Sequence, residues 1–210
     1  MRRTWILWAA GAGFAGLIAV AAIVGRSRFS SSPTPPPNAP AARPARVYHE
    51  ELSGSRYVNR DLGLALTAPQ DWTPSLGKRL EELPPYEGLV LKMESRREPD
   101  PETQFRPLVS VFKKTLAPGS PIDPVGYIRA NLISAPKKVT AAPRLEKVAG
   151  HSVGSVAYDM PAAQGSLRVR QLVRIVNSEA IIVTAFIPAR SYEEFSAVID
   201  KLLGSIDWSS

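Results

Sequence analysis

Residues 167–187 have the hydrophobic pattern of two strands joined by a short polar break. The first strand carries apolar side chains at alternate positions with polar side chains between them, so one of its faces is apolar. The apolar positions are Leu167, Val169, Val173 and Ile175. Residues 180–187 are apolar on both faces, as expected of a central strand that is covered on both sides. The polar residues 177–179 between the two strands predict a hairpin turn.

A helix is predicted to follow this hairpin. Pro188 ends the second strand, and Ser191 with Glu194 three residues later has the spacing of a capping box. The next apolar residues recur at helical spacing as one stripe, made of Phe195, Val198, Ile199, Leu202 and Leu203. Gly204 is placed to end the helix. Because such a helix buries its stripe against its own sheet, residues 167–203 predict an α+β core.

The preceding residues predict further short strands and one more helix. Strands are expected at 57–58, 62–67, 89–93, 108–112, 144–148 and 155–160, and a helical turn at 78–83. Asp123-Pro124 predicts a helix start, with an apolar stripe at Val125, Ile128 and Leu132 that stops before Pro136. Trp72 is expected to close the core at the sheet end, with ligand stacking as the alternative. This order predicts a mainly antiparallel sheet with helices on its faces.

The N-terminal residues 5–24 form a run of 20 residues without a charge, flanked by arginines. A helix of this length spans about 30 Å, the thickness of the hydrocarbon core of a bilayer. Its length favours a retained single-pass anchor, whereas Ala19-Val20-Ala21 favours a signal peptide that is cleaved off with residues 1–21. The two arginines near the start favour a cytoplasmic N-terminus. We therefore expect a periplasmic domain held on the inner membrane, or a secreted domain if cleavage occurs.

Six prolines lie among Ser, Ala and Arg in residues 30–47. Such a composition forms neither helix nor sheet and favours an extended polyproline II spacer. The chain is therefore predicted to comprise a membrane anchor or signal segment at 1–28, a Pro-rich linker at 29–47 and a folded domain at 48–210.

The net charge of +7 is unevenly distributed. Residues 1–47 contain six arginines and no acid, and the remainder has 20 basic and 19 acidic residues. Nucleic-acid binding requires a basic face on the domain itself, so no nucleic-acid partner is expected. The chain has no cysteine, which excludes disulfides, thiolate chemistry and Cys-ligated metal sites.

Motifs for catalysis, cofactors or metals are not found in the sequence. His49 and His151 lack acids or a second histidine at the spacing of a metal site, and Asp159 follows His151 without a nucleophile elbow. We therefore predict no catalytic, cofactor or metal residues. One patterned polar feature remains, the row formed by Arg168, Arg170 and Arg174. It predicts a solvated strand face, or arginine stems that cover apolar surface and pair with acids of neighbouring strands. The alternative is a contact surface for an anion or a protein partner.

The segment YVNRDLGLALTAPQDW (residues 57–72) resembles the opening of PsbP-like domains, with an aromatic residue, a turn, a strand, Pro and then Trp. The resemblance continues through the helix at 124–133, the Gly150 turn, the strands at 153–187, IPARSYEEF and SIDW. It covers about residues 56–208. It implies an α/β/α sandwich around a mainly antiparallel sheet. It also implies a non-enzymatic binding or assembly module, as in photosystem II extrinsic subunits and DcrB-type bacterial envelope proteins.

These observations lead to one main hypothesis, a membrane-tethered extracytoplasmic module that binds a protein partner in the cell envelope and needs no cofactor. Two alternatives stay open. The first is a carrier of a small apolar or anionic ligand, which needs a sizeable cavity between sheet and helix. The second is an enzyme with an unrecognised site of Asp, Glu or Arg, which needs convergent carboxylates with perturbed pKa values.

Overall fold

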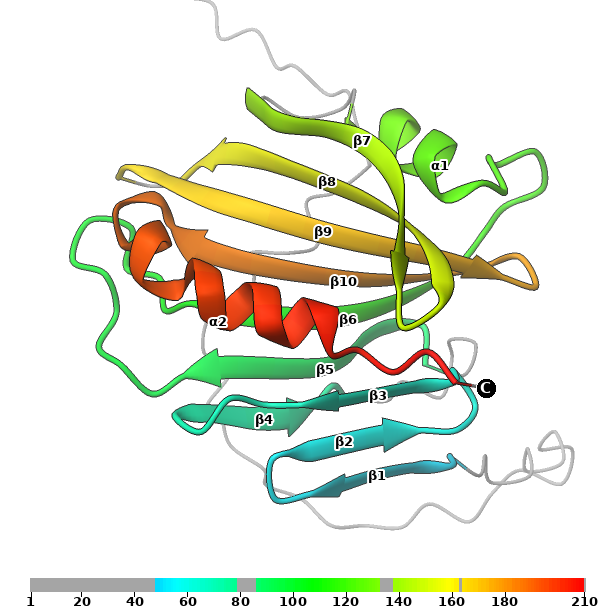
Figure 1. The fold of residues 1–210 in the computed structure, drawn as a ribbon, viewed down its shortest axis with the longest axis horizontal. Helices are drawn as coiled ribbons and strands as arrows, with labels where there is room; N and C mark the ends of the chain where they lie inside the picture. Colours follow the sequence, from blue (N-terminus) through cyan, green and yellow to red (C-terminus); the bar gives the residue numbers. More distant parts are fainter. Residues whose placement is uncertain (1–47, 79–85, 133–137, 163, 210) are drawn as a thin grey trace, which may run out of the picture. The chain divides into compact units, whose positions relative to one another are not determined.

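The computed structural model describes residues 48–78, 86–132, 138–162 and 164–209 (Figure 1). Residues 46–210 form one compact unit. The anchor or signal segment, the Pro-rich linker and most of the helical turn expected at 78–83 lie outside the described residues. None of the helices in the described part is long and apolar enough to cross a membrane.

Seven strands form one antiparallel sheet in the order β4-β5-β6-β10-β9-β8-β7. They are β4 (Trp72–Leu76), β5 (Gly88–Ser95), β6 (Leu108–Thr115), β7 (Lys138–Val148), β8 (His151–Pro161), β9 (Ser166–Val176) and β10 (Glu179–Pro188). The predicted hairpin is confirmed, because β9 and β10 are neighbours joined at residues 177–178. Strand β10 lies at the centre, and all its residues from Ala180 to Pro188 are buried.

A second sheet, which the sequence did not predict, contains β1 (Glu50–Ser53), β2 (Arg56–Asn59) and β3 (Leu64–Thr67) in that order. The strand expected from residue 62 begins two residues later, because the Asn59 side chain accepts a hydrogen bond from the Leu62 amide at 2.9 Å and holds a turn there. Residue Asp207 bridges to β3 through two backbone hydrogen bonds with Ala65, at 2.8 and 3.0 Å. The C-terminal segment thus extends the small sheet.

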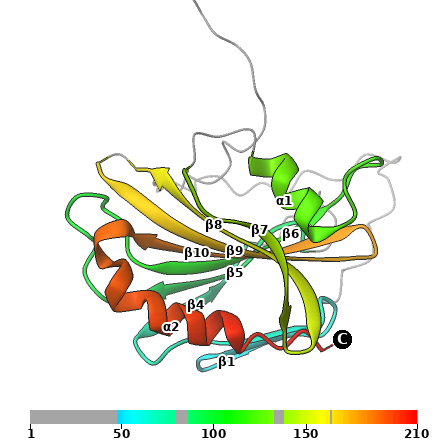
Figure 2. The same ribbon diagram turned by 45° about the horizontal axis from the view of Figure 1, so that its top comes forward.

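Two helices pack against opposite faces of the large sheet, as Figure 2 shows. Helix α1 (Pro124–Leu132) contacts β7, β8 and β9, whereas α2 (Tyr192–Gly204) contacts β10. The alternation of side chains along β10 separates two cores. Ile182 packs in the core that contains Ile128 of α1, and Val183 packs in the core that contains Ile199 of α2. The predicted α+β class and antiparallel sheet are confirmed.

The predicted start of α1 is also confirmed. The Asp123 carboxylate accepts a hydrogen bond from the Gly126 amide at 2.6 Å, as an N-cap residue does. Replacing Asp123 by alanine is expected to lower the free energy of unfolding by about 1 kcal/mol, because the amide loses its acceptor. Urea denaturation measures this loss. Asp123→Asn keeps an acceptor and should remain within a few tenths of a kcal/mol of the parent; equal losses for both variants would contradict the capping role.

The predicted capping box at the start of α2 is wrong. Residues 189–191 form a 3₁₀ turn, so Ser191 already has near-helical angles (φ −94°, ψ 3°) and its side chain makes no capping hydrogen bond. A capping side chain normally belongs to a residue in the β region. Glu194 pairs instead with Arg97. The apolar stripe is confirmed except for Val198, which lies at its edge and is 36% exposed.

Some strands begin or end at other residues than predicted, because prolines and register shifts make them locally irregular. Strand β4 contains Pro74, and it is tolerated because β4 is an edge strand with one free side. Strand β7 reaches back to Lys138 past Pro143, with register shifts between Val139 and Arg144. Trp72 is buried, as predicted for a core residue, although it begins a strand.

Candidate functional site

The predicted arginine row lies on the face of β9 that carries α2. Arg168 pairs with Asp159, its cross-strand neighbour on β8, with Nη2 3.2 Å from Oδ2. Its guanidinium also lies 4.8 Å from the ring centre of Tyr192, at the start of α2. The hydrogen bond with Asp159 raises the pKa of Arg168 and outweighs the opposite effect of burial. The interpretation that the row pairs with acids of neighbouring strands is confirmed for this residue.

The other two arginines reach the C-terminal part of the chain. Arg170 pairs with Asp200 of α2. Arg174 donates a hydrogen bond of 2.8 Å to the carbonyl oxygen of Trp208, and its guanidinium lies 5.7 Å from the Trp208 ring centre. Burial lowers the pKa of Arg174. The row therefore fastens α2 and the C-terminal segment to the sheet, and its role as a partner contact stays a prediction.

Beside α2, the same face of the sheet has a hollow of about 160 Å³, which we call the α2 hollow. Small side chains of β7 and β8 line it, namely Ala141, Ala142, Ser155 and Ala157. Charged side chains line it as well, and these are Arg144, Glu146 and Arg170. Tyr192 and Leu203 contribute from α2. Arg170 thus places the predicted row at the edge of a concave surface.

A second hollow, of about 360 Å³, lies over the three-stranded sheet. Val58 and Ala65 line it together with the charged residues Arg56, Arg60 and Asp207. Hydrogen bonds from Ser209 lower the pKa of Asp207, and the nearby charges of Arg56 and His151 lower it further. Asp207 is therefore ionised near neutral pH, and this hollow presents both signs of charge.

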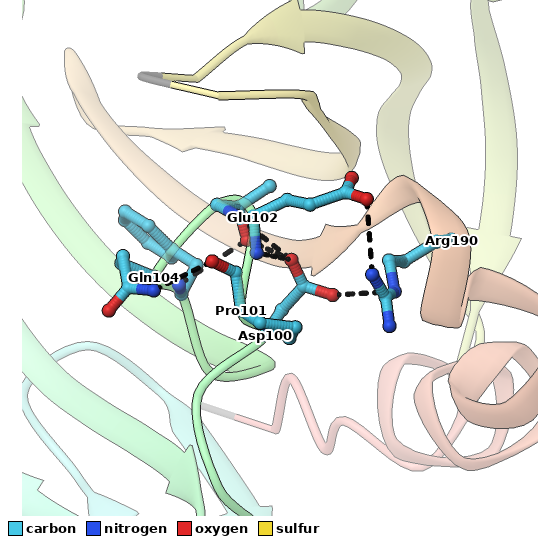
Figure 3. Close-up of polar contacts among 7 residues, drawn as sticks. Asp100, Pro101, Glu102, Gln104 and Arg190 are labelled. Atoms are coloured by element: carbon cyan, nitrogen blue, oxygen red, sulfur yellow. Dashed lines mark hydrogen bonds and ion pairs between the residues drawn. The ribbon is translucent and has the colours of Figure 1, made fainter.

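A polar cluster joins the loop at 96–106 to the start of α2, as Figure 3 shows. Asp100 is only 7% exposed. Its Oδ1 accepts hydrogen bonds from the Thr103 amide at 2.9 Å, the Thr103 hydroxyl at 3.0 Å and the Glu102 amide at 3.1 Å. Its Oδ2 lies 3.0 Å from Nε of Arg190, which also pairs with Glu102 at 3.2 Å.

This cluster was missed by the sequence reasoning. Burial by itself would raise the pKa of Asp100, but the hydrogen bonds from Thr103 and Glu102 and the charge of Arg190 outweigh it, so the pKa is lowered. An ionised carboxylate with this many donors holds structure and does not exchange a proton near neutral pH. The local signal was Asp100 followed three residues later by Thr103, a turn-forming pattern.

Both histidines lie near the second hollow, since the His49 carbonyl oxygen accepts a hydrogen bond from the Arg60 amide and the charge of His151 acts on Asp207. His49 Nδ1 is 2.8 Å from Asp61 Oδ1, and the other Asp61 oxygen accepts a hydrogen bond from Tyr86 at 2.6 Å. Burial by itself would raise the pKa of Asp61, but the hydrogen bonds from Tyr86 and His49 keep it below its usual value. His151 begins β8 and is half-buried. Among the residues whose positions are described, no three His, Cys, Asp or Glu residues are grouped for a metal ion.

Comparison with known proteins finds solved structures with a similar fold. No protein-family model matches the sequence, and neither does any curated protein. The structure is similar to LpqN, described as involved in cell envelope biogenesis of Mycobacterium tuberculosis, with a TM-score of 0.51 and 12% identity over 70% of this chain and 83% of LpqN. Cyanobacterial PsbP (CyanoP) from Synechocystis sp. PCC 6803 has a TM-score of 0.49 and 9% identity over 80% of this chain and 96% of its own. The likeness to LpqN confirms the predicted PsbP-like architecture for the fold alone.

Proposed function

We propose that this PsbP-like domain is a non-enzymatic binding or assembly module of the cell envelope, which holds a protein partner at the α2 hollow. The fold shared with LpqN, a protein described as involved in cell envelope biogenesis, supports the envelope setting. The uncharged residues 5–24 and the Pro-rich residues 30–47 support a tether that keeps the domain on the extracytoplasmic side of the membrane.

The composition of the α2 hollow carries the proposal of a protein partner. Its floor is made of small residues, and paired charges surround it, an arrangement similar to the apolar centre and polar rim of protein interfaces. Arg170 and Asp200 also fix one wall in place, so binding requires little ordering of that wall. Paired charges at the rim add specificity more than affinity.

The size of the hollow favours a partner side chain over a free small ligand. Small-molecule sites usually measure about 300–1,000 Å³, and the α2 hollow has about half of the lower value. The carrier hypothesis expects a larger cavity between sheet and helix. A single apolar side chain of a partner protein fits a hollow of this size, as interface anchors do.

Replacing Ala142 by tryptophan is expected to fill the α2 hollow and to abolish partner binding. Ala142 is exposed, so the substitution should leave stability within about 0.5 kcal/mol. Crosslinking and pull-down from intact membranes should then recover the partner at least about tenfold less well, the equivalent of losing one anchor contact.

The matched control is Ala197→Trp, since Ala197 is an exposed residue of α2 that does not line the hollow. This variant should recover the partner as the parent does. Deleting residues 5–24 tests the tether separately, because a tether raises the effective concentration of the domain at the membrane. Equal recovery for Ala142→Trp and Ala197→Trp would contradict the site, and equal recovery with and without residues 5–24 would contradict the tether.

A further inference from the structure

Both faces of the large sheet carry cations without a carboxylate partner, and on the side of α1 three of them lie on the same face as exposed apolar side chains. On the α2 side, Arg168, Arg170 and Arg190 have carboxylate partners. Arg174 bonds to a backbone carbonyl, and the exposed Lys201 of α2 makes no ion pair within the described residues. The side that carries α1, here called the α1 face, has three exposed cations, Lys114, Arg129 and Lys147. Within the described ranges, none of these three makes an ion pair. The α1 face therefore carries three cations that have no ion-pair partner in the described residues.

Strand register and helix packing place these cations on one side. Lys114 is the cross-strand neighbour of Ala180, whose side chain belongs to the core on the α1 side. Leu145 is the cross-strand neighbour of Gly154, which lies so close beneath α1 that an added Cβ would come within 2.8 Å of Pro124. Lys147 follows Leu145 by two residues and so points to the same side. Arg129 is an exposed residue of α1 itself.

Exposed apolar side chains flank α1 on the same face. Ile122, two residues before α1, is 77% exposed, and Leu145 and Val139 of β7 are 58% and 46% exposed. Val139 is the cross-strand neighbour of Tyr158, a core residue of the α1 side. These three are half of the large apolar side chains that are strongly exposed in the described part of the chain. Figure 2 shows α1 and the loop before it on the side of the sheet away from α2.

Three acids lie near this surface, and one of them is neutralised by a cation. The Asp123 carboxylate caps α1, Glu94 pairs with Lys92 at 2.7 Å, and Glu87 accepts two hydrogen bonds from Thr115. Asp123 and Glu87 keep their negative charges, so the three cations exceed these two acids by one positive charge, beside protruding aliphatic side chains. Both hollows described above lie elsewhere, beside α2 and over the small sheet.

We propose that the α1 face docks on an anionic lipid surface, with Ile122 and Leu145 entering the headgroup region and Lys114, Arg129 and Lys147 contacting lipid phosphates. Aliphatic insertion combined with Lys and Arg is how peripheral segments bind anionic bilayers. Protein interfaces instead centre on aromatic anchors seated in pockets, and the exposed residues of this face are aliphatic. The inference rests on the proposed tether, which holds the domain near a membrane, and it leaves the α2 hollow available for the partner.

The absence of cysteine in the chain permits a direct test by single-site labelling. Ile122→Cys and, as a matched control on the α2 side, Val198→Cys are each labelled with an environment-sensitive fluorophore in the full-length chain. The chain is reconstituted into vesicles of phosphatidylcholine alone or mixed with phosphatidylglycerol, each containing a lipid-borne quencher. We expect quenching at position 122 only with phosphatidylglycerol, and little quenching at 198 in either vesicle.

Raised salt and substitutions of the three cations test the electrostatic contribution to docking. Lys114→Ser, Arg129→Ser and Lys147→Ser should each weaken docking about fivefold, and raised salt should weaken it further. Thermal melting of the labelled chains shows that these exposed substitutions leave the fold intact. Equal quenching at 122 and 198, or quenching at 122 that does not depend on phosphatidylglycerol, would overturn the proposal. Protection of position 122 only after addition of an acidic envelope protein would overturn it in favour of a protein contact.

Flotation of the same vesicles separates this inference from the proposed tether. A chain that floats with phosphatidylcholine vesicles and shows no quenching at 122 retains the tether and overturns the docking. A chain that floats only with phosphatidylglycerol vesicles, with quenching at 122, overturns the tether and supports the docking. A chain that floats with neither overturns both.

Discussion

Replacing Trp208 by alanine is expected to lower the free energy of unfolding by about 3–5 kcal/mol, the usual cost of truncating a buried tryptophan. Trp208 is 0% exposed and belongs to the α2-side core, together with Ile206. The segment at 205–209 also joins the two sheets. Asp207 bonds to Ala65 of the small sheet, and the Trp208 carbonyl accepts from Arg174 of the large one.

Urea denaturation measures the expected loss of unfolding free energy in three variants, Trp208→Ala, Trp208→Phe and Val198→Ala. In the described structure, Nε1 of Trp208 is buried without a hydrogen-bond partner, so phenylalanine removes an unsatisfied donor and should cost clearly less than alanine. Val198 lies at the edge of the α2 stripe and should change stability by less than about 1 kcal/mol. A loss below about 1 kcal/mol for Trp208→Ala would show that the C-terminal segment does not hold the sheets together.

Replacing Asp100 by asparagine is expected to lower the free energy of unfolding by about 1.5–3 kcal/mol near neutral pH, the scale of hydrogen bonds to a charged group. Asparagine keeps an acceptor oxygen for Thr103 and Glu102, but their hydrogen bonds lose a charged acceptor. The substitution also loses the ion pair with Arg190 and places an amide donor beside that guanidinium, which weakens the contact between the loop at 96–106 and the start of α2. Glu98→Gln, an exposed substitution in the same loop, should stay within about 0.5 kcal/mol of the parent.

The pH dependence of this effect has a definite sign. Because the pKa of Asp100 is lower in the folded than in the unfolded state, the unfolded state binds the proton more readily. The stabilisation is fully present above the ordinary pKa of about 3.9 and is lost as pH falls through the folded value. Urea midpoints of the parent and Asp100→Asn should therefore converge in acid. If the two urea midpoints differed by the same amount at every pH, the charge of Asp100 would not be the cause of the stabilisation.

The candidate site shows where sequence reasoning succeeds and where it stops. The arginine row was predictable because a period of two places alternate side chains on one face of a strand. Its partners were not, because Asp200 and Trp208 lie on a helix and a terminal segment whose positions depend on packing. The floor of the α2 hollow was not predictable either. Ala141 and Ala157 become neighbours through a register shift in β7 that no local pattern marks.

The sequence by itself determined the local elements of this domain, namely the β9–β10 hairpin, the apolar stripe of α2 and the start of α1 at Asp123, because each depends on side chains a few residues apart. Only the tertiary structure decided the division into two sheets, the joining of those sheets by residues 205–209 and the pairing of Asp100 with Arg190. Contacts between distant residues are selected by the packing of the whole chain, and the spacing of neighbours along the sequence carries little information about them.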